Sequence, residues 1–271
     1  MKFPLISIAV SSLIAAHAIA QTPGYTLLDL GPAGNSFSQA TYLNNNGFVA
    51  GLATVSGAQH AMLWYQGISG DIGIPGLGGP NSGAFGVTQW GLAMGQGETS
   101  TKDPNNENFC GYGTGLQCLA FLWENGVTTP LATLGGTNAE VGAINNRGEL
   151  AGVAETATRD PKCPAGVAPG GTGPQVLDYE AVIWGPAKGE IHELPPLAGD
   201  TVGYALWIND NGQAVGMSGT CANTQLPPLA AGAHAVLWEN GVAIDLGNLG
   251  GTANPALLGV GNAAFSINNH G

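Results

Sequence analysis

The chain has 271 residues, 44% of them hydrophobic, and a formal net charge of −12, with 6 basic residues against 18 acidic ones. Such an acidic chain lacks the basic surface that nucleic acids require, which excludes them as partners. Only 9% of the residues are charged while 45 are glycine, a composition typical of an all-β protein with many tight turns.

The first twenty residues have the pattern of a secretory signal peptide. Lys2 supplies a positive start, residues 3–16 form a short apolar run, and Ala18-Ile19-Ala20 is an A-x-A cleavage site. We therefore expect the mature chain to begin at Gln21 and to be exported, to the extracellular space or the periplasm. An uncleaved membrane anchor is the alternative, although the run is short against the roughly 20 residues of a bilayer span. No later stretch is long and apolar enough to span a membrane.

Four sequence pieces recur along the rest of the chain, and each is expected to form a short strand. The first is an apolar piece that ends in tryptophan, at Trp64, Trp123, Trp184 and Trp238. The second joins Leu or Ile to glycine, at 28–31, 71–73, 134–136 and 245–247. The third ends in an Asn-rich turn, at 43–47, 87–91, 144–148, 208–212 and 267–271. The fourth follows at once, at 48–51, 92–95, 149–152 and 213–216.

Glycines at fixed positions indicate a hairpin between the third and fourth pieces. The turn glycines are Gly47, Gly91, Gly148 and Gly212, and Asn and Gly tolerate the positive φ that hairpin turns require. A second glycine follows each of them by four residues, at Gly51, Gly95, Gly152 and Gly216. Because a glycine inside a strand marks close backbone approach, we expect these positions to be crowded near the axis of a radial assembly.

Units of four short strands are typical of the blades of a β-propeller. We expect residues 21–271 to form one all-β, propeller-like array of about five four-stranded blades, with about 18 strands. Three inserts, near 98–118, 155–179 and 219–233, lengthen the units. They are expected between the fourth piece of one copy and the tryptophan strand of the next, projecting from one face that is a candidate binding surface. The sequence ends at Gly271 after an Asn-rich turn, so we expect a truncated chain and an incomplete ring.

The recurring tryptophans Trp64, Trp123, Trp184 and Trp238 are interpreted as packing residues between blades, because apolar residues flank them. The alternative is an exposed row of tryptophans that stacks on sugar rings.

Four cysteines in an exported chain predict disulfides: Cys110, Cys118, Cys163 and Cys221. Of the three pairings that four cysteines allow, we favour Cys110–Cys118, a local loop, and Cys163–Cys221, which would join two neighbouring inserts. The cysteines have no C-x-x-C pair and no histidine at zinc spacing, so we predict no metal site there.

The motif carried by residues 60–64, 119–126 and 234–241, followed by a Leu-Gly-Gly or Asp-Leu-Gly step and then Ile-Asn-x-x-Gly, resembles the bacterial extracellular HAF-repeat family. The resemblance covers nearly all of 25–271. It implies a secreted, propeller-type protein and no particular chemistry, and it carries over no catalytic residue.

Signatures of catalysis are missing from the sequence, and we predict no catalytic residue and no cofactor. His60 and His234 share one repeat position, as do Asp29, Asp71 and Asp245, so both sets are interpreted as structural. Residues 209–212 carry oxygens that could bind calcium, but the alternating spacing of a calcium loop is missing. An enzyme would need paired carboxylates, and the unrepeated acids, which we interpret mostly as solvated loop charges, are Asp103, Glu107, Asp160, Asp178 and Asp200.

These observations favour a secreted, non-catalytic scaffold that binds a glycan or a protein partner. A secreted glycoside hydrolase or lyase on a propeller is the first alternative, and a truncated fragment without independent function is the second.

Overall fold

The computed structural model describes residues 24, 27–30, 36–73, 76–163, 175–222, 224, 233–247 and 261–271. The expected signal peptide, 1–20, and parts of the second and third inserts lie outside these residues. Every regular element in the described part is a β-strand, in agreement with the all-β prediction. None of its segments is a helix long and apolar enough to cross a membrane.

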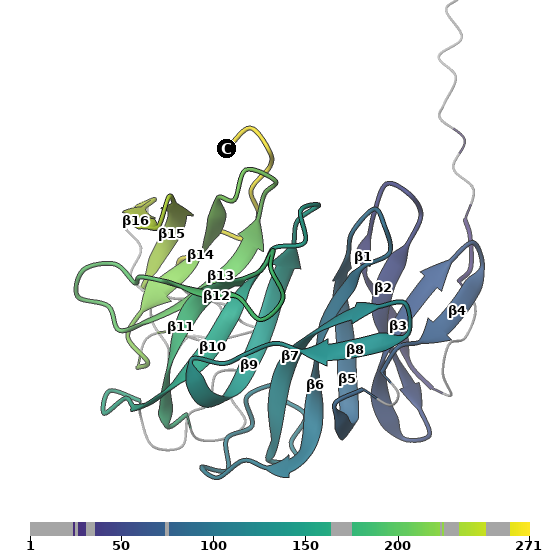
Figure 1. Ribbon diagram of the computed structural model, residues 1–271, viewed down its shortest axis with the longest axis horizontal. Coiled ribbons are helices and arrows are strands. Elements are labelled where there is room, and N and C mark those ends of the chain that lie inside the picture. Colours follow the sequence, from purple (N-terminus) through teal and green to yellow (C-terminus); the bar gives the residue numbers. More distant parts are fainter. Residues whose placement is uncertain are drawn as a thin grey trace, which may run out of the picture.

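The strands form four separate antiparallel sheets of four strands each (Figure 1). The first sheet contains β1 (Ser38–Leu43), β2 (Val49–Val55), β3 (Ala58–Tyr65) and β4 (Ile68–Asp71). The second contains β5 (Gly78–Val87), β6 (Ala93–Lys102), β7 (Leu116–Glu124) and β8 (Val127–Pro130). The third contains β9 (Gly135–Ile144), β10 (Leu150–Arg159), β11 (Leu177–Trp184) and β12 (Ile191–Leu194). The fourth contains β13 (Val202–Ile208), β14 (Ala214–Gly219), β15 (His234–Glu239) and β16 (Val242–Asp245).

Each sheet starts at the strand before the Asn-rich turn, whereas the sequence suggested units that start at the tryptophan strand. The strand expected at the second piece also lies elsewhere along the chain. The outer strand follows the tryptophan strand after a tight turn, as β8 does, and the Leu-Gly step at 134–136 lies where the connection enters β9, the first strand of the next sheet. The described part contains 16 strands where about 18 were expected, because neither residues 27–30 nor 267–271 are strands.

The three inserts share one topological position, but it lies inside a sheet and not between copies. They connect the second strand to the third, as between β6 and β7. In the first sheet the same connection is a tight turn at Ser56-Gly57, where both residues have positive φ. The inserts therefore lie at the opposite end of the sheets from the Asn-rich turns.

Three of the Asn-rich turns are closed by hydrogen bonds from the backbone to the side chain of their first asparagine. Asn44 Oδ1 accepts hydrogen bonds from the backbone N–H groups of Asn46 and Phe48, at 2.9 and 3.0 Å. Asn145 and Asn209 repeat the arrangement. Gly47 has a φ of +83°, so the turn uses the left-handed conformation that glycine adopts without steric cost.

The second-strand glycines pack directly against the first strand, as the sequence suggested. A Cβ at Gly152 would lie 2.2 Å from the carbonyl oxygen of Glu140, and one at Gly216 would lie 1.9 Å from that of Tyr204. Each first strand also carries a β-bulge next to this contact, at Thr41, Phe85, Gly142 and Leu206. Bulges redirect side chains and are common beside functional sites.

Neighbouring sheets pack face to face through small apolar cores. The indole N–H groups of Trp184 and Trp238 each donate to a carbonyl just after the outer strand of the preceding sheet, that of Ala132 at 2.8 Å and that of Pro195 at 2.7 Å. Trp64, Trp184 and Trp238 are buried and Trp123 is half-buried. Burial of these rings leaves no exposed tryptophan row at the repeat position.

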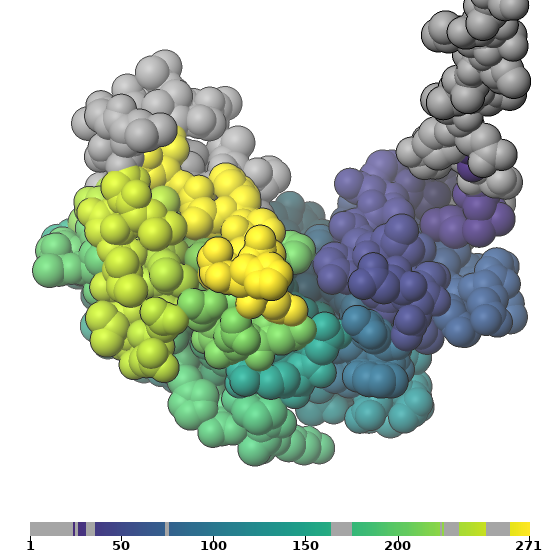
Figure 2. Space-filling view, turned by 90° about the horizontal axis from the view of Figure 1, so that it is seen from above, coloured from purple at the N-terminus to yellow at the C-terminus, as the bar shows by residue number. Residues whose placement is uncertain are grey.

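The first strands of all four sheets converge. Their turns surround a pocket of about 190 Å³, to which residues 267 and 269 also contribute. Tyr42 of the first sheet and Trp207 of the fourth have ring centroids 6.3 Å apart. Viewed from this end, the described residues leave an open gap between the C-terminal segment and the first sheet (Figure 2).

Both predicted disulfides are confirmed. Cys110 pairs with Cys118 inside the first insert, and Cys163 pairs with Cys221, joining the second and third inserts. Two disulfides suit an oxidising compartment.

Candidate functional site

The interpretation of the unrepeated acids as solvated loop charges is wrong for three of them. Asp103, Glu107 and Asp160 are only 5%, 0% and 7% exposed. The structure brings Asp103 and Glu107 close to Glu155, while Asp200 lies elsewhere and pairs with His234. These side chains fold inward because the inserts supply backbone and amide N–H donors for them.

Asp103, Glu107 and Glu155 form a buried carboxylate cluster held by hydrogen bonds. Glu107 Oε1 accepts from the backbone N–H groups of residues 176 and 177, at 2.6 and 3.0 Å. Asn138 Nδ2 donates to both Asp103, at 3.1 Å, and Glu155, at 3.0 Å. Burial and the neighbouring charge of Glu107 raise the pKa of Glu155. Because N–H donors already contact these carboxylates, the cluster serves as an internal brace of the inserts.

The buried acids predict that stability falls with rising pH. Burial raises the pKa of Glu140 to about 8 and that of Glu180 to about 9. The folded state therefore holds protons that the unfolded chain releases above about pH 4.5, and the free energy of unfolding falls until the pH passes these values. We expect a clearly higher denaturant midpoint at about pH 5 than at about pH 9. The pKa of Glu155 is raised in the same way, so Glu155→Gln should reduce the difference between the two midpoints. Equal midpoints at the two pH values in the wild-type protein would contradict this account.

Two of the buried glutamates, Glu98 and Glu155, form the same side-chain pair with an asparagine, and this repeated pair was not predicted from the sequence. Asn81 Nδ2 donates to Glu98 at 2.8 Å, as Asn138 Nδ2 does to Glu155. Each of these glutamates lies three residues after a second-strand glycine, and this spacing could have revealed the pair. Asn138 Oδ1 also accepts from the backbone N–H of Cys118 in the preceding sheet, at 2.9 Å, so the pair ties neighbouring sheets together.

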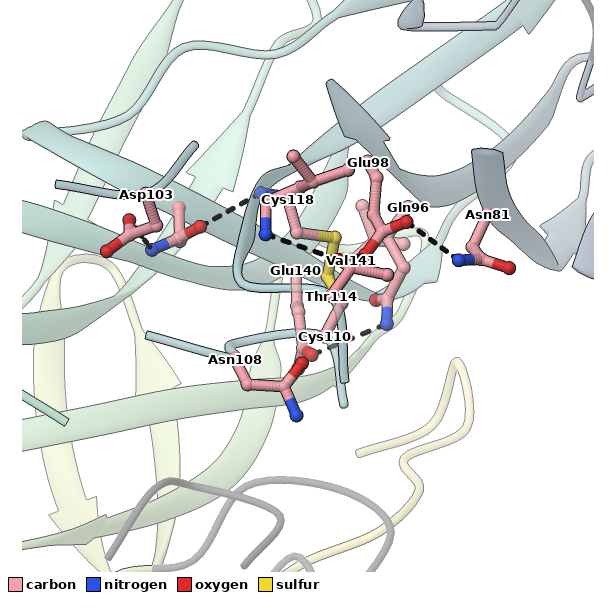
Figure 3. Close-up of a disulfide and its surroundings, with 12 residues drawn as sticks. Asn81, Gln96, Glu98, Asp103, Asn108, Cys110, Thr114, Cys118, Glu140 and Val141 are labelled. Carbon is pink, nitrogen blue, oxygen red and sulfur yellow. Dashed lines mark hydrogen bonds between the residues drawn. A yellow bond between two sulfur atoms is a disulfide. The ribbon is translucent and has the colours of Figure 1, made fainter. Parts of the chain in front are cut away.

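Glu140 differs from these acids because it lines a pocket. It lies on β9, is 2% exposed, and its Oε2 has no hydrogen-bond partner among the described residues. Its Oε1 accepts one long hydrogen bond from Gln96 Nε2, at 3.4 Å, close to the Cys110–Cys118 disulfide (Figure 3). A buried carboxyl oxygen without a partner is costly, so it marks a position where a ligand could donate or accept.

The Glu140 pocket has a volume of about 260 Å³ and largely apolar walls. It is lined by Phe85, Gln96, Glu140, Val141, Gly142, Tyr204, Leu206, Trp207 and Phe265. Three of these positions, Phe85, Gly142 and Leu206, are the first-strand bulges. Phe265 is 60% exposed and Trp207 also borders the pocket at the Asn-rich turns. The Glu140 pocket therefore lies where the first strands converge.

The pKa of Glu140 sets the chemistry of the pocket. Burial raises it to about 8, against a smaller opposing effect of the Gln96 hydrogen bond. At neutral pH the carboxyl is mostly protonated, so it can both donate and accept a hydrogen bond without carrying charge. Glu140 is also the single carboxylate among the residues that line this pocket.

Two clusters with catalytic or metal-binding residue types have the wrong geometry. Asp160 lies beside Cys163 and Cys221, but both sulfurs are committed to a disulfide and supply no thiolate. Ser218, His234 and Asp200 also meet, but the Ser218 hydroxyl donates to Asp200 at 2.7 Å and not to the imidazole. A serine nucleophile needs a histidine base at its own oxygen.

The calcium alternative at residues 209–212 has its oxygens occupied. Asn209 Oδ1 accepts from the N–H groups of Asn211 and Gln213, both at 3.0 Å. Asp210 accepts from Asn146 and Asn269, and these hydrogen bonds outweigh its slight burial and lower its pKa. The turn oxygens thus link one unit to the next.

The other repeated acids and histidines hold local structure. Asp71 Oδ1 and Asp245 Oδ1 accept from the backbone N–H two residues later, at 2.9 and 2.8 Å. His60 pairs with Asp71 at 2.7 Å. His234 pairs instead with Asp200, at 2.8 Å.

A second hollow of about 700 Å³ lies between the second and third sheets. Its cationic Arg147 is neutralised by Glu149, to which both Nε and Nη2 donate. Its polar groups do not converge on an unsatisfied atom, so the Glu140 pocket is the stronger candidate.

No family model, no curated protein and no solved structure matches this chain.

Proposed function

We propose that this chain is a secreted, non-catalytic repeat protein of propeller type, similar to the HAF-repeat family, which binds the end of a neutral glycan in the Glu140 pocket. The observation that carries the proposal is the buried, mostly protonated Glu140 carboxyl, with one oxygen unpartnered, in an aromatic-walled pocket.

The propeller arrangement is supported by hydrogen bonds that pass from one unit to the next at equivalent positions. Asn44 Nδ2 donates to the carbonyl of Thr88 at 2.7 Å, and Asn145 Nδ2 donates to that of Asn209 at 3.0 Å. Asn209 Nδ2 continues the series to the carbonyl of Asn268, at 2.9 Å. Such a series around converging first strands supports a radial array, for which we propose about five blades.

A neutral sugar suits this pocket better than a charged ligand. Hydroxyl groups can pair with a protonated carboxyl and with the Gln96 amide, while the C–H face of a sugar ring can pack on aromatic side chains such as Trp207 and Phe265. A volume of about 260 Å³ is below the roughly 300–1,000 Å³ of sites for drug-sized ligands. The pocket therefore suits the terminal residue of a glycan and not an internal stretch.

Binding without turnover is favoured over glycoside hydrolysis. Hydrolysis uses two carboxylates flanking one bond, and the residues lining this pocket include one, Glu140. The buried cluster of Asp103, Glu107 and Glu155 is held by protein N–H donors instead.

The test is binding of the secreted protein to a panel of neutral oligosaccharides, with the tightest member then titrated against variants. We expect Glu140→Ala to weaken its affinity by roughly 10-fold or more, because the unpartnered carboxyl is the central polar contact. Affinity of the wild-type protein should also fall as the pH rises through about 8, where Glu140 ionises.

Glu140→Gln is the matched control. It keeps a neutral donor and acceptor of the same size, so binding should persist and lose its pH dependence. The proposal fails if no neutral oligosaccharide binds, or if Glu140→Ala binds as tightly as the wild-type protein. Release of a shortened sugar during the titration would favour the hydrolase.

A further inference from the structure

The third sheet carries two acids at repeat positions where the first sheet carries a histidine and an acid. Glu180 and His60 each lie four residues before the repeat tryptophan of their sheet. Glu193 and Asp71 each pair in register with the residue two before that tryptophan. Glu180 therefore takes the place of His60, and Glu193 takes the place of Asp71.

In the first sheet these two positions form a close pair. His60 Nδ1 lies 2.7 Å from Asp71 Oδ2. The two residues are diagonal neighbours on adjacent antiparallel strands, a separation that long side chains span. Glu180 is as buried as His60, and each is 7% exposed. In the third sheet, however, a second carboxyl group replaces the imidazole that pairs with the acid.

A buried oxygen of Glu180 lacks a partner. Its Oε2 has no hydrogen-bond partner among the described residues, and none of the ion pairs in that part of the chain involves Glu180. The undescribed residues after position 20 include no lysine, arginine or histidine. The third sheet packs against the second and the fourth. Because an unpaired buried carboxyl is costly, Glu180 marks a position for a bound ligand.

More acids lie around Glu180. Asp178 precedes it by two residues on β11, so both side chains lie on one face of the strand. Burial, and then the charges of Asp178, Glu193 and Asp160, raise the pKa of Glu180 to about 9. Burial and the charges of Asp160 and Glu193 also raise the pKa of Asp178 to about 6. These carboxyl groups are therefore close enough to repel one another.

We infer that Asp178, Glu180 and Glu193 bind a calcium ion, which pairs with the acids as the His60 imidazole does in the first sheet. Carboxylate oxygens favour a hard cation such as Ca²⁺ or Mg²⁺. In the described part their oxygens do not all lie within 4.8 Å of one another, so the exposed Glu193 side chain turns inward on binding. Calcium accepts such an irregular, adjustable set, whereas magnesium requires a near-ideal octahedron. The calcium site is separate from the Glu140 pocket and does not depend on glycan binding.

The test is the melting temperature of the secreted protein in a chelator and in increasing Ca²⁺, with sodium chloride holding the ionic strength constant. Constant ionic strength is needed because an acidic chain also responds to general screening. Extracellular calcium sites have dissociation constants near 1 mM, so roughly 10 mM Ca²⁺ should raise the melting temperature by about 3–5 °C. Mg²⁺ at the same concentration should have a smaller effect.

Three variants locate the effect. Glu180→His recreates the first-sheet pair with Glu193, so the variant should remain folded in the chelator and lose the calcium shift. Glu193→Gln changes an exposed side chain, so it should fold normally and reduce the shift by roughly half or more, because one of three ligands is lost. Glu124→Gln is the matched control. Glu124 is an exposed acid on β7 of the second sheet, and its removal should leave the shift unchanged.

Three results would overturn the inference. The wild-type protein could show no calcium shift at constant ionic strength. Glu193→Gln could keep the full shift, which decides the question even if Glu180→His does not fold. Glu124→Gln could lose as much of the shift as Glu193→Gln, which would identify a general effect of negative charge and not a site.

Discussion

Replacing Gly152 with alanine is expected to destabilise the protein by about 3 kcal/mol or more, because a backbone carbonyl and a buried ring both lie against the position of the missing side chain. A Cβ there would lie 2.2 Å from the carbonyl oxygen of Glu140 and 2.6 Å from the Trp184 ring. The carbonyl belongs to the adjacent strand and the ring is buried and hydrogen-bonded to the preceding sheet. Neither can move away without opening the sheet, so the secreted yield and the denaturant midpoint should both drop.

Gly70→Ala is the control for this substitution. Gly70 also lies in a strand, β4, but the nearest atom to a Cβ there is the Leu63 carbonyl oxygen at 3.8 Å, an ordinary contact. We expect a change within about 0.5 kcal/mol, as for surface positions in general. Similar midpoints for the two variants would show that the close approach at Gly152 does not limit stability.

The features that were predictable from sequence are the ones encoded locally. An Asn-rich turn needs a positive φ and an Asn side chain within four residues, so Asn44 and Gly47 identify it without tertiary information. The Cys110–Cys118 pair closes a short loop. Repetition then extends each local feature along the chain, which is why the strand type and the glycine contacts could be predicted.

Which strand begins each sheet was not predictable in the same way. A cyclic series of four strands reads identically from any starting piece, and the tight turn after the tryptophan joins strands just as the Asn-rich turn does. What decides the sheet boundary is the connection after the outer strand, where Ile72 leaves the first sheet to pack against Phe121 of the second. That contact is long-range and has no local signature.

The candidate site was missed because charge was taken as a sign of exposure. Glu140 lies at no conspicuous motif, and only the convergence of four first strands buries it. Glu107 was assigned to a solvated loop, yet the backbone N–H groups of a second insert enclose it. The distance between these inserts along the chain hides such pairings from sequence reasoning.

Removing the Cys163–Cys221 disulfide is expected to cost about 4 kcal/mol, close to the entropy that a cross-link over 58 residues removes from the unfolded chain. The bond also joins two inserts around a core that includes Phe109, Tyr179 and Met217. Replacing both cysteines by alanine should therefore lower the melting temperature strongly and separate the third sheet from the fourth at their insert ends.

The Cys110–Cys118 disulfide provides an internal comparison, because it spans only 8 residues. The same entropy argument gives about 2.5 kcal/mol for its removal, so the double-alanine variant of this pair should unfold at a higher denaturant concentration than that of Cys163–Cys221. Equal losses would mean that local packing at the inserts, and not the length of the closed loop, governs the stabilisation. A smaller loss for Cys163–Cys221 would mean that the second and third inserts remain close in the unfolded chain, which would weaken the argument that the disulfide holds the third and fourth sheets together.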